Sequence, residues 1–313
     1  MRRLTYLSLR CVVEFLDPAK RIYIISRCPH LKRMEKIVPL HVKCLKMDDD
    51  FLSLDAFSIS CSIAYEHEVK FEMVQNTKKE IGRPFPMHLS PFETGDVLLE
   101  YYLGGRTMIY VDLIQCENSI AHITFPENLM FKVNKLDSGS HYFGDFFPVI
   151  SVHSFPLKTL RTGIEGNSFH TNTIARSAKE LIVVVDKHGV SKEMQNIHEL
   201  PNKKVLFEDN YGSSLFVMRI IVDWFRNSTE NERRFSFTSI NDNFIEDILK
   251  QLDESFHRFR DDLEGVNERF MPDKPRFLLP TLEDKSRVQV YVIQTGSDES
   301  PKPQLVVNNV SKL

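Results

Sequence analysis

The chain has 313 residues, of which 42% are hydrophobic and 27% charged, with 12 Gly and 15 Pro, a composition that excludes a wholly disordered or collagen-like protein. At about 150 residues per domain, the length leaves room for about two domains, or for one domain with a small appendage. Lys and Arg number 40 against 43 Asp and Glu. The resulting charge of −3 argues against a nucleic-acid binder that relies on a broad basic field, although it leaves a local patch open.

The cysteines and the apolar runs indicate where such a chain resides. The five cysteines are Cys11, Cys28, Cys44, Cys61 and Cys116, and no two are spaced as Cys-x-x-Cys. An odd number of thiols without that spacing favours reduced cysteines, which we expect in a cytoplasmic or nuclear protein. No run of about 18 apolar residues occurs, so the sequence predicts no membrane span and no membrane partner. The charged residues that interrupt the apolar N-terminus argue against a signal peptide.

The first 39 residues are predicted to form short helices. Apolar residues recur at helical spacing from about Leu4 to Leu16, and Asp17-Pro18 is typical of an N-cap followed by proline in the first turn. A second helix is expected over Arg21–Arg27, and a third short turn follows Pro29.

Period-two patterns take over after residue 39. Strands are predicted at 40–47, 57–63, 107–115 and 119–125, with a helix over 96–103 that ends at a glycine pair and a loop over 134–148. Further strands are predicted at 181–185, 205–209, 235–239 and 288–293, and helices capped by Ser213 and Ser239 lie between them.

The first three C-terminal strands start 24 and 30 residues apart, which suggests a curved parallel sheet of the leucine-rich-repeat type. The predicted fold class is therefore α+β: a short N-terminal helical block, a strand-rich middle and C-terminal strand–helix units. We expect a helical block over 1–39, an α/β substrate- or partner-binding domain over 40–293, and a disordered tail over 294–313.

Each candidate enzyme motif in the sequence is explained better by a structural role. The sequence lacks His-Glu-x-x-His, a phosphate loop and Gly-x-Ser-x-Gly. Cys61 with His67, or Cys116 with His122, matches a nucleophile and base, but buried core thiols are the stronger interpretation. The segment Leu103-Gly104-Gly105-Arg106 fits an anion-binding turn less well than a helix C-cap. The eleven His are scattered, and Asp48–Asp50 lacks the pattern of a calcium loop. We expect no enzymatic activity, no metal and no cofactor.

The N-terminal helix is apolar over twice the arc that a one-sided surface helix needs. With Leu9 at zero and 100° per residue, apolar side chains extend from Cys11 near 200° through Phe15, Val12 and Leu16 to Val13 near 40°, an arc of roughly 200°. In the second helix, Ile24 points away from Ile22. A block of this size cannot cover both faces itself, so either the rest of the chain or another protein covers the second face.

Short motifs in this block resemble the F-box, a three-helix module. Leu4 takes the leucine place of the F-box start and Thr5 stands where proline is usual. Leu16-Asp17-Pro18 matches the turn that follows the first helix, and Cys28 and Leu31 match the third element. The tryptophan that usually follows the cysteine is absent.

Most of the chain is similar to a nematode-expanded family of F-box C proteins, whose large C-terminal domain is uncharacterised. The matching pieces, in order, are Leu16-Asp17-Pro18 with Lys20-Arg21-Ile22, Arg27-Cys28-Pro29 with Leu31, Ile37-Val38-Pro39-Leu40, Leu103-Gly104-Gly105-Arg106, Phe155-Pro156-Leu157-Lys158 with Leu160, and Asn202-Lys203-Lys204-Val205.

This resemblance implies a substrate-recognition adaptor without activity of its own. The N-terminal helices would bind the Skp-type linker protein of a cullin–RING ubiquitin ligase, and the C-terminal domain would hold an unknown protein substrate. The residues expected at the partner face are Leu4, Leu7, Val12, Val13, Leu16, Pro18 and Ile24. The alternative is an interaction scaffold without ligase contact, whose N-terminal helices pack against its own sheet.

Overall fold

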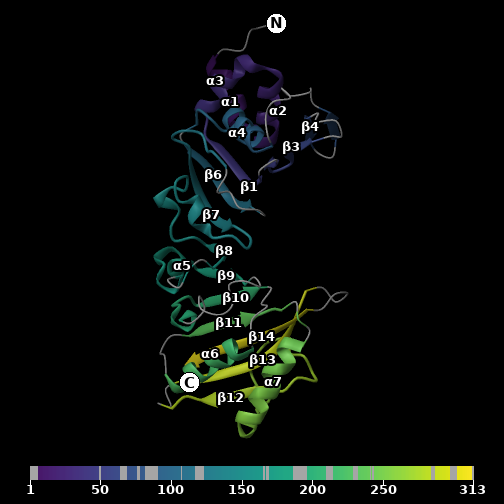
Figure 1. Cartoon of the computed structure of the whole chain (residues 1–313). Helices are drawn as coiled ribbons and strands as arrows, with labels where there is room; N and C mark the ends of the chain where they lie inside the picture. The colour runs from purple at the N-terminus through teal and green to yellow at the C-terminus, as the bar shows by residue number, and fades with distance from the viewer. Residues whose placement is uncertain are drawn as a thin grey trace. The chain divides into compact units, whose positions relative to one another are not determined.

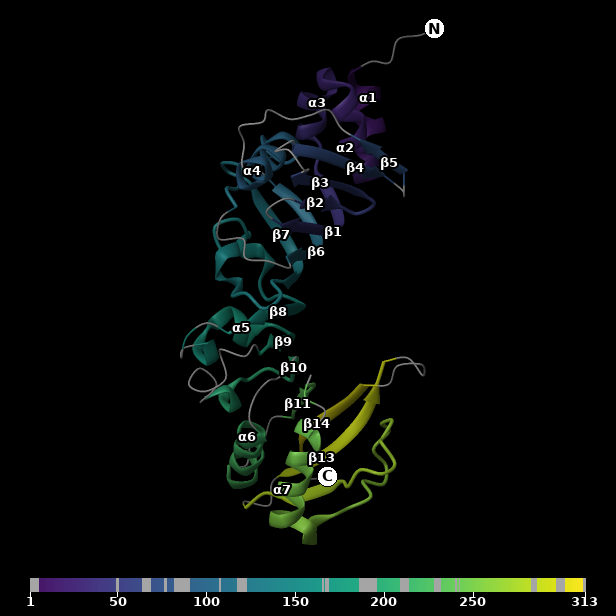
Figure 2. The same ribbon diagram turned by 45° about the vertical axis from the view of Figure 1, so that its right-hand side comes forward.

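The computed structural model forms two compact units, Met1–Leu157 and Lys158–Leu313 (Figures 1 and 2). It describes residues 6–48, 51–63, 69–75, 78–81, 91–106, 108–116, 123–164, 166, 169–185, 196–208, 214–227, 232–239, 241, 243–282, 286–296 and 302–311. Both units combine helices with a sheet, as the predicted α+β class requires. Within the described residues, no helix has the length and apolar character needed to cross a membrane.

The first unit opens with the helical block and continues into a sheet. Its helices are α1 (Tyr6–Phe15), α2 (Pro18–Arg27), α3 (Lys32–Ile37) and α4 (Pro91–Tyr102), with 3-10 turns η1 (Pro29–Leu31), η2 (Phe143–Phe146) and η3 (Val152–Ser154). Its strands are β1 (Leu40–Asp48), β2 (Phe51–Leu54), β3 (Phe57–Ile63), β4 (Val69–Gln75), β5 (Lys78–Ile81), β6 (Met108–Cys116) and β7 (Met130–Asp137).

The sheet of the first unit has the order β7-β6-β1-β2-β3-β4-β5. Strands β7, β6 and β1 run parallel, and β1 to β5 form an antiparallel meander. In β1 the side chains of Leu40, Val42, Leu45 and Met47 are buried, whereas His41, Lys43 and Lys46 are exposed. Helix α2 packs on β1 and β3, and α4 packs on β2 and β3 (Figure 2), so the helical block is attached to the sheet through α2.

The second unit begins with strands that alternate with helices and ends in an antiparallel group. Its helices are α5 (Thr173–Ser177), α6 (Ser214–Arg226) and α7 (Asn243–Phe256), with 3-10 turns η4 (Phe169–Thr171), η5 (Ile197–Glu199) and η6 (His257–Phe259). Its strands are β8 (Thr159–Gly163), β9 (Glu180–Val184), β10 (Lys204–Glu208), β11 (Arg233–Phe237), β12 (Phe277–Pro280), β13 (Ser286–Thr295) and β14 (Lys302–Ser311).

Strands β8, β9, β10 and β11 pair in parallel, and β11, β14, β13 and β12 follow in antiparallel order. The parallel pairing predicted for the C-terminal strands is confirmed. One face of these strands is apolar and carries the rings of Phe207, Phe235 and Phe237, all fully buried. Helix α6 covers this face with Phe216 and Trp224, whose rings contact those of Phe207 and Phe235 edge-on.

The prediction of a disordered tail is wrong. Residues 302–311 form β14, which lies between β11 and β13 in the sheet. Leu305, Val306 and Val307 are fully buried there, so the apolar run outweighs the polar and proline-rich residues before it. Pro303 is tolerated because it pairs only with β13, beyond the end of β11.

Two boundaries in the first unit also differ from the sequence prediction. Residues 123–126 carry no strand, and 119–122 lie outside the described residues. The next strand after β6 is β7, which extends into the segment predicted as a loop, because Phe131, Val133 and Leu136 supply its buried side. The chain divides into units after Leu157, whereas the domain boundary predicted after residue 39 stays a prediction.

Candidate functional site

The N-terminal helices have a small core of their own. Val13 of α1 packs with Met34 and Val38, all at most 6% exposed, and the half-buried Leu9 and Leu31 lie against them. Leu9 and Val13 are four residues apart and therefore share one side of α1. This side of α1 faces inward.

The opposite side of α1 is mainly apolar and exposed, and Ser8 is the polar residue among its side chains. The side chains of Leu7, Val12 and Phe15 are 70%, 48% and 89% exposed, and Cys11 is also exposed. At 100° per residue these four side chains span about 140° and lie away from the inward pair. We call Leu7, Cys11, Val12 and Phe15 the outer face of α1. Because large apolar side chains seldom gather on a free surface, this face is a candidate binding surface.

Helix α2 begins as the sequence predicts and packs on the sheet. The Asp17 carboxylate accepts a hydrogen bond from the Ala19 amide at 2.9 Å, and Pro18 occupies the first turn. Ala19 and Ile22 are 2% and 0% exposed. The inner side of α2 is therefore covered by the protein's own sheet.

A small recess lies between α1, α2 and η1. Val13, Leu16, Ile24 and Leu31 line it together with the charged pair Arg21 and Glu35. Leu16 and Ile24 are half-buried, so the recess is open to solvent on one side. It brings together three of the residues that the sequence predicts at the partner face.

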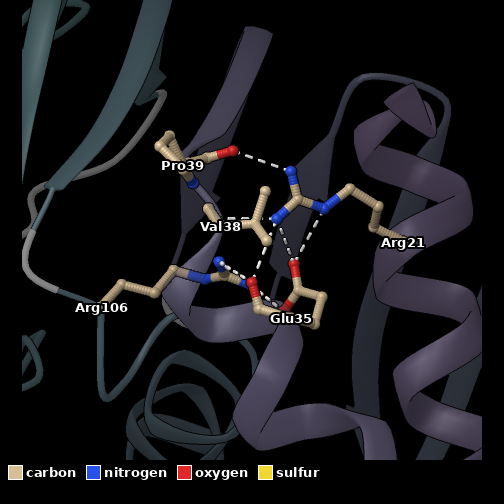
Figure 3. A network of polar contacts seen from close by, with 5 residues as sticks. All are labelled: Arg21, Glu35, Val38, Pro39 and Arg106. Atoms are coloured by element: carbon tan, nitrogen blue, oxygen red, sulfur yellow. Dashed lines mark hydrogen bonds and ion pairs between the residues drawn. The ribbon is translucent and has the colours of Figure 1, made fainter. Parts of the chain in front are cut away.

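A buried ion network fixes the helical block to the sheet (Figure 3). The Glu35 carboxylate, in α3, is 1% exposed and lies between the guanidinium groups of Arg21 and Arg106. Arg21 donates to Glu35 Oε1 from Nε at 3.0 Å, and its Nη1 and Nη2 donate to the carbonyl oxygens of Pro39 and Val38 at 2.8 and 2.9 Å. These bonds connect α2, α3 and the start of β1.

Arg106 approaches the same carboxylate from the end of α4. Its Nη2 pairs with Glu35 Oε2, while its Nε has no hydrogen-bond partner among the described residues. Burial lowers the pKa of Arg106, and the adjacent Glu35 carboxylate opposes this effect. The network therefore depends on Glu35, which is the counter-ion of both arginines.

The glycines before Arg106 end α4, as the helix C-cap interpretation predicts. The Gly104 amide donates to the carbonyl oxygens of Leu99 and Glu100, each at 3.1 Å, and Gly105 has φ of +74°. This geometry is a helix C-terminus followed by a left-handed glycine. The turn positions Arg106 toward Glu35.

The structure separates the predicted partner residues into groups. Leu7 and Val12 lie on the outer face of α1, whereas Val13 is buried in the core of the block. Leu16 and Ile24 line the recess, and Pro18 is half-buried at the start of α2. Leu4 lies outside the described residues.

Sequence reasoning missed Phe15 and Cys11 as candidates. Both lie on the apolar arc of the helical projection, on the side away from Leu9. Periodicity gives the angle between side chains but not the direction of the core, so it could not separate the two sides. The inward position of Val13 settles which side is free.

The described residues include only part of the candidate catalytic groups. They contain no group of three or more His, Cys, Asp or Glu placed to hold a metal ion. Cys116 is buried and its thiol donates to the Met47 carbonyl at 2.8 Å, whereas His122, its proposed partner, lies outside the described residues, as does His67. A cavity of about 680 Å³ is lined by residues of 123–130 and 144–149, and Asp145 is the one ionisable side chain among them.

Comparison with known proteins identifies part of the chain. Residues 93–241 match a domain of unknown function (DUF3557). The match begins in α4 and ends before α7, and it excludes the N-terminal block. Searches of curated proteins and of solved structures returned no match.

Proposed function

We propose that the protein is a non-enzymatic adaptor that binds the Skp-type linker protein of a cullin–RING ubiquitin ligase through its N-terminal block. The observation that carries the proposal is the outer face of α1, where Leu7 and Phe15 are 70% and 89% exposed, whereas the opposite side of the helix packs in the core of the block. The resemblance of this segment to the F-box, and of the chain to nematode F-box C proteins, supports the choice of a Skp-type linker protein as the partner.

In this function the second unit holds a protein substrate. The parallel strands β8 to β11 alternate with helices that cover one face, which supports a leucine-rich-repeat-like arrangement. The adaptor would then act by proximity alone, since it raises the effective concentration of substrate lysines near the charged ubiquitin. We place this activity in the cytoplasm or nucleus, without cofactor, nucleic acid or membrane.

A second candidate is a scaffold without ligase contact. The burial of Ala19 and Ile22 against the sheet favours it, because this half of the block is already used within the chain. The outer face of α1 and the half-exposed Ile24 favour the adaptor, since the scaffold requires both to be covered by the protein itself.

The two candidates are separated by a binding measurement on the full chain. The purified protein is titrated with a Skp-type linker protein bound to the N-terminal part of a cullin. We expect Leu7→Asp to weaken binding at least about tenfold, because burying one leucine contributes about 1.5–3 kcal/mol. Leu215→Asp is the matched control, since Leu215 in α6 is also 70% exposed.

Two results would contradict the adaptor function. The first is the absence of binding by the unmodified protein, which leaves the scaffold. The second is an equal loss of affinity in Leu7→Asp and Leu215→Asp, which would show that the outer face of α1 is not the site of contact. Circular dichroism of both variants checks that each remains folded.

A further inference from the structure

The parallel strands of the second unit begin with a row of cations. The register pairs Thr159 with Glu180 and Lys204 with Arg234, and Leu181 with Val205. One position earlier, Lys158, Lys179, Lys203 and Arg233 therefore stand side by side across β8, β9, β10 and β11. The Glu180 amide donates to the Lys158 carbonyl at 3.1 Å, and the Arg234 amide to the Lys203 carbonyl at 2.9 Å, so the ladder continues through this row. We call these four residues the basic row.

The lysines of the basic row are free to meet a partner. Lys158, Lys179 and Lys203 are all exposed, and none forms a salt bridge with another described residue. Arg233 is different, because it donates to the carbonyl oxygens of His198 and Leu200 and stacks on the Trp224 ring. The row thus has one anchored end and a run of solvent-exposed ammonium groups.

Such a row opposes the stability of the sheet. Neighbouring strands lie about 4.8 Å apart, and like charges at facing positions on adjacent strands repel one another. Nearby acids compensate only in part, since the exposed Glu180 bonds to Thr159 and Glu208 pairs with Arg161. A negatively charged partner along the row would remove this repulsion.

A hollow of about 330 Å³ lies on the other face of these strands, because its lining residues alternate with the direction of the basic row and successive side chains of a strand point to opposite faces. Lys204, Arg234, Ser236 and Gln304 line it together with Glu180 and the apolar Leu206. Arg234 is held by an ion pair with Glu268 and Ser236 is 7% exposed, so the lining is fixed on this side. The hollow is therefore not part of the surface that the basic row presents.

We infer that the basic row binds an extended acidic segment of a partner protein. The basic row crosses three strand-to-strand steps of about 4.8 Å and therefore spans about 14 Å. An extended peptide places the side chains of one face about 7 Å apart, so about five of its residues cover the row. Carboxylates at alternate positions of that segment meet the exposed lysines. The inference rests on the proposed function only in assigning this segment to the protein that the adaptor holds.

The test uses the full chain and a labelled nine-residue peptide that carries glutamate at alternate positions. Its matched control is the same peptide with glutamine in place of glutamate. We expect fluorescence anisotropy to show binding of the glutamate peptide alone, with an affinity that falls as salt is added. Lys158→Gln, Lys179→Gln and Lys203→Gln should each weaken it about two- to fivefold, as expected for exposed ion pairs. Lys250→Gln, at an exposed site in α7, should leave the affinity unchanged.

Thermal unfolding gives a second, independent measurement. Because the lysines repel one another, Lys179→Gln should unfold at the same temperature as the unmodified chain or higher, so weakened binding is not explained by loss of structure. Equal binding of the two peptides, or equal effects of Lys179→Gln and Lys250→Gln, would overturn the inference. Tighter binding of a single-stranded RNA of the same charge would also overturn it. None of these measurements involves the linker protein, so their failure is distinct from failure of the proposed docking.

Discussion

Removal of the Glu35 carboxylate is the most informative perturbation of the first unit. Glu35 is the shared counter-ion of Arg21 and Arg106, and all three side chains are at most 3% exposed. In Glu35→Ala both guanidinium groups remain buried without a carboxylate. Removing one partner of a buried ion pair costs about 3–5 kcal/mol, because the remaining charge has lost its counter-ion away from water.

A surface ion pair in the same unit provides the matched control. Lys135 and Asp112 lie 3.6 Å apart and are 44% and 47% exposed. Exposed pairs of this kind contribute about 0–1 kcal/mol. We therefore expect Asp112→Asn to change the free energy of unfolding by less than about 1 kcal/mol, against about 3–5 kcal/mol for Glu35→Ala.

Hydrogen exchange followed by mass spectrometry measures this difference where it arises. In Glu35→Ala, the free energy of opening measured for amides of β1 and β6 should fall by about 3–5 kcal/mol. These strands are affected because Arg21 is bonded to the residues just before β1. Trp224 is the only tryptophan of the chain and lies in the second unit. The urea midpoint of its fluorescence transition should therefore be the same in Glu35→Ala as in the unmodified chain. Equal losses of protection in Glu35→Ala and Asp112→Asn would refute the reasoning.

Three further predictions concern single sites in the first unit. Gly104→Ala should lower the free energy of unfolding in urea more than Gly105→Ala does. A Cβ on Gly104 would clash with the Glu100 backbone. Gly105 requires only a left-handed conformation, which costs other residues about 1–2 kcal/mol. Val13→Ala should lower the free energy of unfolding by about 2 kcal/mol, because Val13 is 5% exposed in the core of the block. Burial raises the pKa of the Cys44 thiol, which lowers its thiolate fraction at mildly alkaline pH. Iodoacetamide should therefore alkylate Cys44 more slowly than the exposed Cys11, and peptide mass spectrometry measures both rates.

Local chemistry made much of the fold predictable. Asp17-Pro18 predicted the start of α2, and Gly104-Gly105 predicted the end of α4, since both signals act within a few residues. The short apolar runs of the C-terminal half placed β9, β10, β11 and β13 to within about two residues. Strand β8 was missed because Thr159 and Arg161 give it too few apolar residues to stand out.

Features that depend on distant contacts were beyond the sequence. Glu35 meets Arg106 across a separation of 71 residues, and nothing near either residue marks the pair. The outer face of α1 was only half predicted, because an apolar arc does not reveal which side the core occupies. Phe15 became a candidate once the packing of Val13 against Met34 was known.

The limits of the matched region 93–241 have a practical consequence for anyone who isolates it. Strand β6 lies inside these limits but its parallel neighbour β1 lies outside, and β11 is likewise cut off from β14. A fragment cut at residues 93 and 241 would expose two rows of unpaired backbone amides and carbonyls, the kind of edge that recruits strands from other molecules. We expect this fragment to aggregate during expression, whereas the full chain keeps both edges paired.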